Sequence, residues 1–182
     1  MPNPFVPQRH SIRLKNYDYS QAGAYFVTIV TQGREKLFGD IKGSKMGLNP
    51  YGLIVQQTWN GLPAHYSHIQ LDEFCILPNH VHGIIWITGD DFSSGRGGFE
   101  TRPYADLPRQ PLSEIVRAFK TFSARRINEL RRTPGAPIWQ RNYYEHILRS
   151  ESELNRVREY ILANPFNWES DQENPALFTV SH

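Results

Sequence analysis

The chain has 182 residues, of which 39% are hydrophobic, 13% are aromatic and 21% are charged, and its formal net charge is +2. This length is that of one domain, and the aromatic content provides enough apolar area to offset the entropy of folding, which excludes a disordered chain. The mean hydropathy is −0.54, the apolar runs are no longer than a strand, and the N-terminus has no apolar signal segment. We therefore expect a cytoplasmic protein that neither spans a membrane nor is secreted.

The first predicted elements are a strand and a helix. Residues 25–31 are β-branched and aromatic, as in a central strand, and residues 37–41 are expected to form the arm of a short edge hairpin. Asn49 as the N-cap and Pro50 at the first helical position begin a predicted helix. Its apolar residues recur at helical spacing as far as Pro63, which indicates about three to four turns.

Two strands and a long loop follow. Residues 70–77 and 80–88 are joined by the two-residue turn Pro78-Asn79, which predicts an antiparallel hairpin. The single cysteine, Cys75, lies in the first of these strands, so we expect a buried thiol in a reducing compartment. Residues 89–111 are rich in Gly, Ser and Pro and are expected to form a flexible loop.

A helix, a strand and a further helix complete the predicted order. Apolar residues recur at helical spacing over 112–132, residues 139–148 are a predicted strand, and Ser150 is the N-cap of a last helix that Pro165 ends. The βαββαβ order indicates an α+β, ferredoxin-like fold: an antiparallel sheet with helices on one face, here with an additional C-terminal helix. We expect one domain over residues 1–182, with an N-terminal arm (1–20), the 89–111 loop and a C-terminal tail (166–182).

Two histidines on the second strand of the predicted hairpin are candidate metal ligands. His80 and His82 are two residues apart, so on a strand their side chains project from the same face and can bind one divalent ion. Taken alone, such a pair is more often chance, or two polar residues on a solvated face. The apolar residues around it favour a buried strand that presents the pair to a cleft.

The last helix carries the second feature. Leu154, Val157 and Ile161 form its apolar stripe, and Tyr160 and Asn164 lie one turn apart on the flank of that stripe. A tyrosine at such a boundary is most often a packing residue with its hydroxyl in water. It can also act as a covalent nucleophile when a metal polarises its electrophile, and the amide oxygen of Asn164 can be a third ligand beside two histidines.

Three motifs occur in a fixed order: residues 77–85 (LPNHVHGII), 139–149 (WQRNYYEHILR) and 159–165 (EYILANP). Together with residues 17–28, they closely resemble the REP-associated tyrosine transposases, which are single-tyrosine members of the HUH (His-hydrophobe-His) endonuclease superfamily. The resemblance covers about residues 9–168. Three ordered motifs are far more specific than a histidine pair alone.

The resemblance implies a ferredoxin-like fold whose additional C-terminal helix carries the nucleophile, a Mg²⁺ or Mn²⁺ ion, and strand-specific cleavage and rejoining of single-stranded DNA near hairpins. By their places in the motifs, His80 and His82 correspond to the metal ligands, Tyr160 to the nucleophile and Asn164 to the third ligand. The expected partner is single-stranded DNA with a REP-like hairpin, bound by a nucleoid-associated monomer or homodimer with no membrane contact.

The expected reaction joins the 5′ phosphate of the cut DNA to Tyr160 and leaves a free 3′-OH, whose reverse attack rejoins the strand. A phenol must lose its proton to attack, and His146 is a candidate for that proton transfer. An ordinary hydrogen-bonded strand histidine is an equally good interpretation of His146.

Candidate DNA contacts come from two basic blocks. Residues 1–45 hold seven Lys or Arg against three Asp or Glu, and residues 113–149 hold eight against three. Such blocks can face phosphates, although a solvated helix face is the commoner explanation of any one of them, and the aromatic pair 143–144 can stack on bases or pack on the sheet. Arg126 falls near the apolar stripe of its helix, so we expect it to need a carboxylate or a phosphate as partner. The candidates are Arg9, Arg13, Arg117, Lys120, Arg126, Arg141, Tyr143, Tyr144 and Arg149.

Two other functions stay open from the residues alone. A non-catalytic, ferredoxin-like nucleic-acid-binding module needs the basic blocks but not the histidines, Tyr160 and Asn164 together. A metal hydrolase that uses the histidine pair with water does not need Tyr160 and leaves no protein–DNA adduct. Tyrosine transesterification is favoured because one motif order accounts for both features.

Overall fold

A four-stranded antiparallel sheet organises the computed structural model, which describes residues 18–88 and 110–178. The strands lie in the order β4 (Ile69–Ile76), β5 (His80–Ile87), β1 (Gly23–Val30) and β6 (Tyr144–Leu148). Helices connect β1 to β4 and β5 to β6, and all neighbouring strands are antiparallel. This topology confirms the predicted ferredoxin-like α+β fold.

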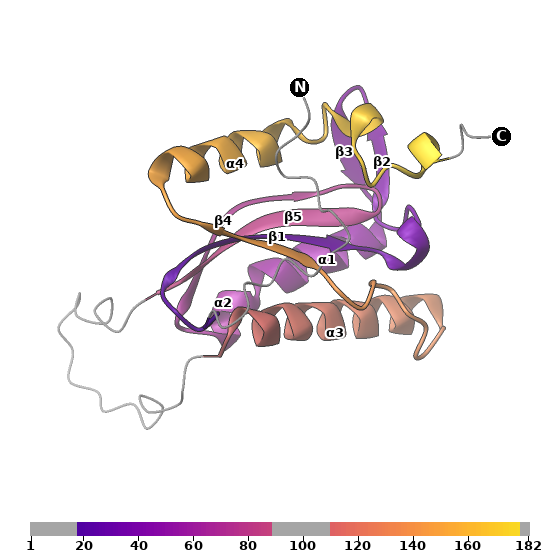
Figure 1. Ribbon diagram of the computed structural model, residues 1–182. Helices are drawn as coiled ribbons and strands as arrows, with labels where there is room; N and C mark the ends of the chain where they lie inside the picture. The colour runs from indigo at the N-terminus through magenta and orange to yellow at the C-terminus, as the bar shows by residue number, and fades with distance from the viewer. Residues whose placement is uncertain (1–17, 89–109, 179–182) are drawn as a thin grey trace.

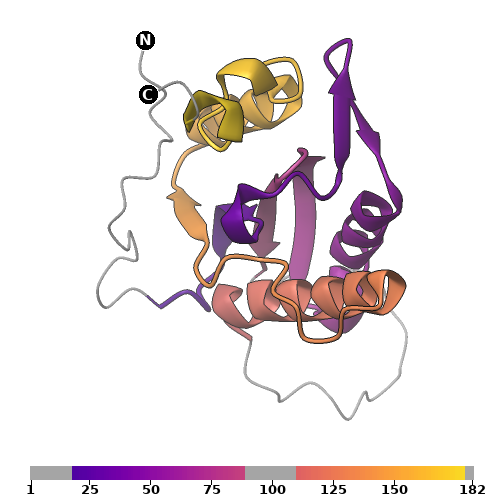
Figure 2. The same cartoon turned by 90° about the vertical axis from the view of Figure 1, so that its right-hand side faces the viewer.

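Helices cover both faces of this sheet. The helices α1 (Pro50–Asn60), α2 (Leu62–His65) and α3 (Leu112–Arg131) lie on one face, and α4 (Glu151–Ala163) lies on the other (Figure 1). The hairpin of β2 (Gly39–Lys42) and β3 (Lys45–Leu48) forms a separate two-stranded sheet that stands apart from the main one (Figure 2). Short 3-10 turns complete the described elements: η1 (Gln32–Arg34), η3 (Trp168–Ser170) and η4 (Pro175–Phe178).

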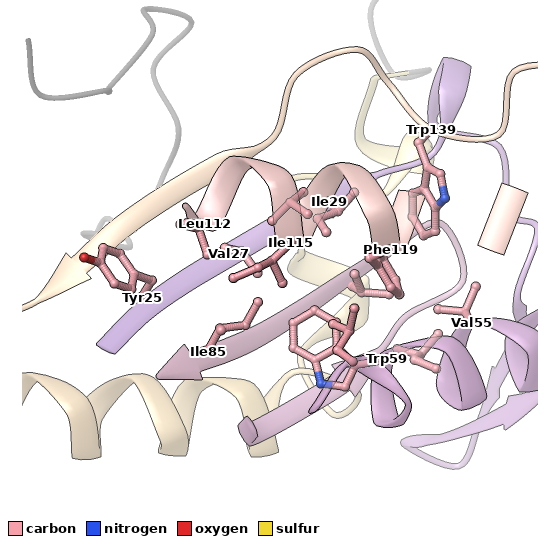
Figure 3. Packing of buried hydrophobic residues seen from close by; sticks show 14 of the residues in the cluster. Tyr25, Val27, Ile29, Val55, Trp59, Ile85, Leu112, Ile115, Phe119 and Trp139 are labelled. Atoms are coloured by element: carbon pink, nitrogen blue, oxygen red, sulfur yellow. The ribbon is translucent and has the colours of Figure 1, made fainter. Parts of the chain in front are cut away.

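Strand β1 is apolar along its length because both of its faces are covered. Its residues from Ala24 to Val30 are all buried. Tyr25, Val27 and Ile29 alternate along it and pack with Ile85 against α1 and α3 (Figure 3). Phe26 points to the other face and packs with the stripe of α4. The prediction of a central strand here is therefore confirmed.

The helix starts follow the predicted capping residues. The Asn49 side chain accepts hydrogen bonds from the backbone N–H groups of Tyr51 and Gly52, and the Ser150 hydroxyl accepts one from Glu153. The first predicted helix is broken at Gly61, so that α1 ends at Asn60 and α2 is a separate short helix.

The predicted strand over residues 139–148 is shorter than expected. Strand β6 begins at Tyr144, and Trp139 forms only an isolated bridge with Thr31. The Trp139 ring lies in the core against Phe38 and Phe119, at centroid distances of 5.0 and 5.5 Å. The chain stays bonded to β1 through the N–H of Gln140, which donates to the Val30 carbonyl at 2.9 Å, and the regular ladder begins only at Tyr144.

The buried stripe of α3 does not include every apolar residue of the predicted 112–132 helix. Ile127 is buried as expected, whereas Phe122 and Leu130 are exposed and Ser123 is buried beside Ile127. Ser123 is buried because its hydroxyl accepts the indole N–H of Trp139 at 2.9 Å. Arg126 is exposed as well, and its guanidinium donates to the side-chain oxygen of Gln57 at 2.8 Å rather than to a carboxylate.

Part of the expected C-terminal tail is packed on the protein. Trp168 is 7% exposed, and its ring centroid lies 6.0 Å from that of His80. Most of the expected N-terminal arm and of the 89–111 loop lies outside the described residues. Within the described ranges, no helix is long and apolar enough to span a membrane.

Candidate metal centre and active site

The two histidines predicted as metal ligands face each other at the start of β5. His80 is fully buried and His82 is 4% exposed, and their side chains point to the face of the sheet that α4 covers. Their Nε2 atoms are 3.0 Å apart. Two nitrogen atoms that converge in this way can bind one cation between them.

The other nitrogen of each ring has a partner that orients it. The Nδ1 atom of His80 lies 2.8 Å from the Oδ1 atom of Asn79, and that of His82 lies 2.8 Å from the Thr28 hydroxyl on β1. Phe26 stacks on the His82 ring at 5.4 Å. These contacts hold both rings with Nε2 facing inward, as in protein metal sites where the second ring nitrogen is hydrogen-bonded.

Burial keeps both rings in the form that binds metal. It lowers the pKa of His82 to about 3, and burial together with neighbouring His82 lowers the pKa of His80 well below its ordinary value. Both imidazoles are therefore neutral at pH 7, with a lone pair available for a ligand bond. Cys75, which pairs with His82 across the strands, stays protonated at pH 7 because burial raises the pKa of its thiol to about 12.

Helix α4 brings Tyr160 to the histidines. Leu154, Val157 and Ile161 are buried against the sheet, which confirms the predicted stripe and turns its flank toward β5. The Tyr160 hydroxyl lies 3.4 Å from the Nε2 atom of His82. Its half-buried ring packs edge-on against Phe26, at a centroid distance of 6.1 Å.

Asn164 ends α4 one turn after Tyr160. The residue is 1% exposed, and neither atom of its side-chain amide has a hydrogen-bond partner within the part of the chain that the structure describes. A buried amide without a partner costs folding free energy, on the order of 1–3 kcal/mol. Such an amide oxygen is available to a ligand, which is consistent with the predicted third metal ligand.

Asp171 was missed from the sequence and joins the same site. Its Oδ2 atom lies 3.9 Å from the Nε2 atom of His80, and one ligand atom from each of Asp171, His80 and His82 lies within 4.8 Å of the others. Burial raises the pKa of Asp171 to about 6. Asp171 was not considered because residues 166–182 were expected to form a tail. Trp168, a large apolar side chain three residues earlier, is the signal in the sequence that indicates a packed segment.

His146 is held by the first turn of α4. Its Nε2 atom lies 2.7 Å from the Oε1 atom of Glu153, which also accepts the backbone N–H of Arg149 at 2.8 Å. Glu153 lies seven residues before Tyr160, about 10 Å along the helix. The hydrogen-bonded strand histidine is thus present, and a role in proton transfer stays a prediction.

Several predicted DNA contacts have partners within the protein. Lys120 donates to the backbone oxygens of Gln140 and Arg141 at 2.6 and 2.8 Å, and Arg117 pairs with Glu114. Both belong to α3, which lies across the sheet from the histidines (Figure 1). Arg9 and Arg13 lie outside the described residues.

The remaining predicted contacts lie in or beside β6, the edge strand that pairs with β1. Arg141 and Arg149 are exposed before and after the strand. Tyr143 packs against the core on the α1 and α3 side, and Tyr144 packs against the α4 side, with its ring edge-on to Phe26. The two half-buried rings therefore belong to different layers and do not form one stacking surface.

The chain has relatives among known proteins, although no family model matches it. It is 41% identical over 177 residues to an uncharacterised protein of Haemophilus influenzae, with 93% of this chain and 95% of that protein covered. A second protein of that organism, named "Putative REP-associated tyrosine transposase", is 28% identical over 154 residues, with 84% of this chain and 76% of that protein covered. The solved structure of a REP-associated tyrosine transposase bound to a REP hairpin has a TM-score of 0.55 and 17% identity, and the match covers 85% of this chain and 73% of that one.

One sequence relative and one solved structure carry the name REP-associated tyrosine transposase, and this chain is similar to the first in sequence and to the second in fold. The antiparallel sheet, with a histidine pair on one of its inner strands and a tyrosine-bearing helix packed over it, is consistent with the shared fold. The chain therefore resembles the REP-associated tyrosine transposases, in line with the resemblance that its three sequence motifs carry.

Proposed function

We propose that this protein is a metal-dependent, strand-specific endonuclease and transesterase that cleaves and rejoins single-stranded DNA near hairpins through a 5′-phosphotyrosine. One observation carries the proposal: the Tyr160 hydroxyl lies 3.4 Å from the Nε2 atom of His82, which itself faces the Nε2 atom of His80 at 3.0 Å. A nucleophilic hydroxyl beside a pair of neutral imidazoles is the arrangement that the reaction requires.

The residues of the site fit a divalent cation. They offer two imidazole nitrogens, the carboxylate of Asp171 and the buried amide oxygen of Asn164 that has no hydrogen-bond partner among the described residues. Oxygen ligands suit Mg²⁺ and Mn²⁺, and imidazole ligands suit transition metals such as Mn²⁺. We assign His80, His82 and Asn164 as ligands, with Asp171 as a further oxygen donor. A bound cation supplies stabilisation of the negative charge that develops on the scissile phosphate.

Tyr160 then performs the covalent step. Its hydroxyl oxygen forms a bond to phosphorus while the bond between phosphorus and the 3′ oxygen breaks, and the leaving oxygen takes up a proton. One phosphodiester replaces another, so attack by a 3′-OH on the phosphotyrosine rejoins DNA without ATP. The proton of Tyr160 passes to a base, and His146, held by Glu153, is the residue to which we assign this transfer.

The DNA partner follows from the family and from charge. A hairpin of REP type is bound in the solved relative, and we propose the same class of substrate here. Arg141 and Arg149, exposed at the two ends of β6, are the described cations that we assign to phosphates of the bound DNA. The Arg9 and Arg13 contacts, which lie outside the described residues, are proposed from the sequence alone.

The test is covalent capture. The protein is incubated with Mn²⁺ and hairpin-bearing single-stranded DNAs, and the adduct is measured on a denaturing gel. We expect the adduct with the wild type, and its loss in Tyr160→Phe and in His80→Ala. Tyr51→Phe is the matched control, since it removes a hydroxyl from another half-buried tyrosine, on α1 across the sheet, and should leave the adduct unchanged.

Each other outcome contradicts the proposal in its own way. Cleavage without an adduct indicates a metal hydrolase that uses water. Binding of the hairpins without cleavage, by a folded and metal-loaded protein, indicates a nucleic-acid-binding module. An adduct that survives Tyr160→Phe indicates that another tyrosine is the nucleophile.

A further inference from the structure

We infer that Asn79 is a positioning residue of the proposed metal centre: it holds His80 in the tautomer with the proton on Nδ1, and it ties the segment that carries Asp171 to the start of β5. The inference rests on the function proposed above for His80, His82 and Asp171. Asn79 is fully buried in the turn between β4 and β5.

The Asn79 side chain uses both of its N–H donors and its oxygen to contact three different parts of the chain. Its Nδ2 atom donates to the backbone oxygen of Glu173 at 2.7 Å and to that of Arg34 at 3.1 Å. Its Oδ1 atom lies 2.8 Å from the Nδ1 atom of His80. One amide therefore joins η1, the C-terminal segment and the first histidine.

These partners determine which way the amide faces. A reversed amide would place its oxygen against two carbonyl oxygens that are 2.7 and 3.1 Å away, and no hydrogen could lie between them. The oxygen therefore faces His80, and the Nδ1 atom of His80 must donate to it. In a neutral ring this leaves the lone pair on Nε2, the atom that faces His82 and Asp171.

His82 is held differently. Its Nδ1 atom lies 2.8 Å from the Thr28 hydroxyl, which can donate or accept. His82 can therefore carry its proton on Nε2, donated to His80, or shift it to Nδ1 when a cation takes its place. Only the His80 tautomer is dictated by its neighbour, which gives Asn79 an effect specific to one ring.

The same amide anchors the segment that carries Asp171. The Glu173 carbonyl that accepts from Asn79 lies two residues after Asp171, and the Glu173 N–H donates to the Oδ1 atom of Asp171 at 2.7 Å. An ion pair at 2.7 Å between Arg34 and Glu173 also ties the segment to η1. Asn79 thus links the position of the carboxylate to the orientation of the histidine that it faces.

The experiment uses the full-length protein without added metal, then with Mn²⁺. The ¹⁵N chemical shifts of the ring report the His80 tautomer. Amide hydrogen exchange over residues 171–174 reports the stability of the segment that carries Asp171, and the Mn²⁺ dissociation constant reports the affinity of the metal centre. We expect the Nδ1–H form of His80 in the wild type. We expect Asn79→Ala to lose this preference, to speed exchange in the segment and to weaken Mn²⁺ binding by about 10–100-fold.

Two further variants separate the roles. Asn79→Asp keeps an acceptor for His80 but loses both donors, so we expect the wild-type tautomer together with faster exchange over residues 171–174. Asn128→Ala is the matched control: Asn128 is a buried asparagine on α3 that donates to the backbone oxygen of Ala136 at 2.8 Å. This control should leave the His80 tautomer unchanged and the Mn²⁺ affinity within about twofold of wild type.

The inference is overturned if wild-type His80 carries its proton on Nε2, a result that needs no variant to fold. It is also overturned if Asn79→Ala keeps the tautomer and the Mn²⁺ affinity of the wild type. A wild type that binds no Mn²⁺, but whose His80 tautomer depends on Asn79, contradicts the proposed function and leaves the positioning role standing.

Discussion

Replacing Gly83 by alanine tests how closely β5 is packed against the helices. Gly83 follows His82 and faces the opposite side of the sheet, toward Trp59. A Cβ atom at this position would lie 2.4 Å from Cζ2 and 2.6 Å from Cη2 of the Trp59 ring. Trp59 is 1% exposed and stacks on Phe74 at 4.4 Å, so the ring has no free space into which to move.

Two effects of opposite sign decide the result. Alanine in a strand is favoured over glycine by about 0.5–1 kcal/mol, because its unfolded chain has less entropy to lose. An added methyl group in a packed core costs about 1–3 kcal/mol of folding free energy. Because the new methyl group would overlap the rigid Trp59 ring, we expect the cost of Gly83→Ala to lie at the upper end of that range. We expect a net loss of about 2 kcal/mol, equivalent to a fall in Tm of about 4–8 °C for a domain of this size.

Urea and thermal unfolding of the metal-free protein measure this loss. Trp59→Phe removes the ring atoms that the new methyl group would meet, and it breaks no hydrogen bond, since the indole nitrogen has no partner among the described residues. We therefore expect the double variant to be less destabilised than the sum of the single variants. A Gly83→Ala protein as stable as wild type, or strictly additive losses, would refute the packing argument.

Two other predictions concern charged groups. The Arg158 guanidinium donates a hydrogen bond to Asp72 at 2.9 Å and lowers the pKa of that carboxyl below its ordinary value of 3.8. The stabilising effect is therefore present above pH 3.8 and is lost as the pH falls through the lower pKa of the folded state. We expect Asp72→Asn to be less stable than wild type in urea at pH 7, with the difference shrinking toward pH 3; a constant difference would contradict this. Lys120→Met removes the donor to the Gln140 and Arg141 carbonyls and should lower stability by about 1–2 kcal/mol. Unchanged thermal unfolding with a reduced salt dependence of DNA binding would instead assign Lys120 to the DNA.

Most elements of the fold could be predicted because their signals are local. The period of the α4 stripe and the capping residues Asn49 and Ser150 lie within a few residues of one another, so the sequence alone locates these helices. The order of six elements then indicates the ferredoxin-like topology, which the structure confirms. The errors fall where a distant partner overrides a local pattern, as when Trp139 enters the core and its hydrogen bond buries Ser123 in place of Phe122.

Part of the candidate site could also be predicted from local spacing. The spacing of His80 and His82 on a strand predicts that they share a face, and the helical spacing of Tyr160 and Asn164 predicts that they share a flank. The structure brings the first three together, and the assignment of all four as the reacting and ligating groups stays a prediction.

By itself, the sequence determined the buried stripe of α4 and the shared face of His80 and His82, because the periods of helices and strands are properties of the backbone. Only the tertiary structure decided that Asp171 faces His80 and that Asn79 links the two. The physical reason is that these contacts join segments far apart in the chain. No repeating pattern encodes their approach, which depends on Trp168 and Asn79 packing into the same buried corner of the fold.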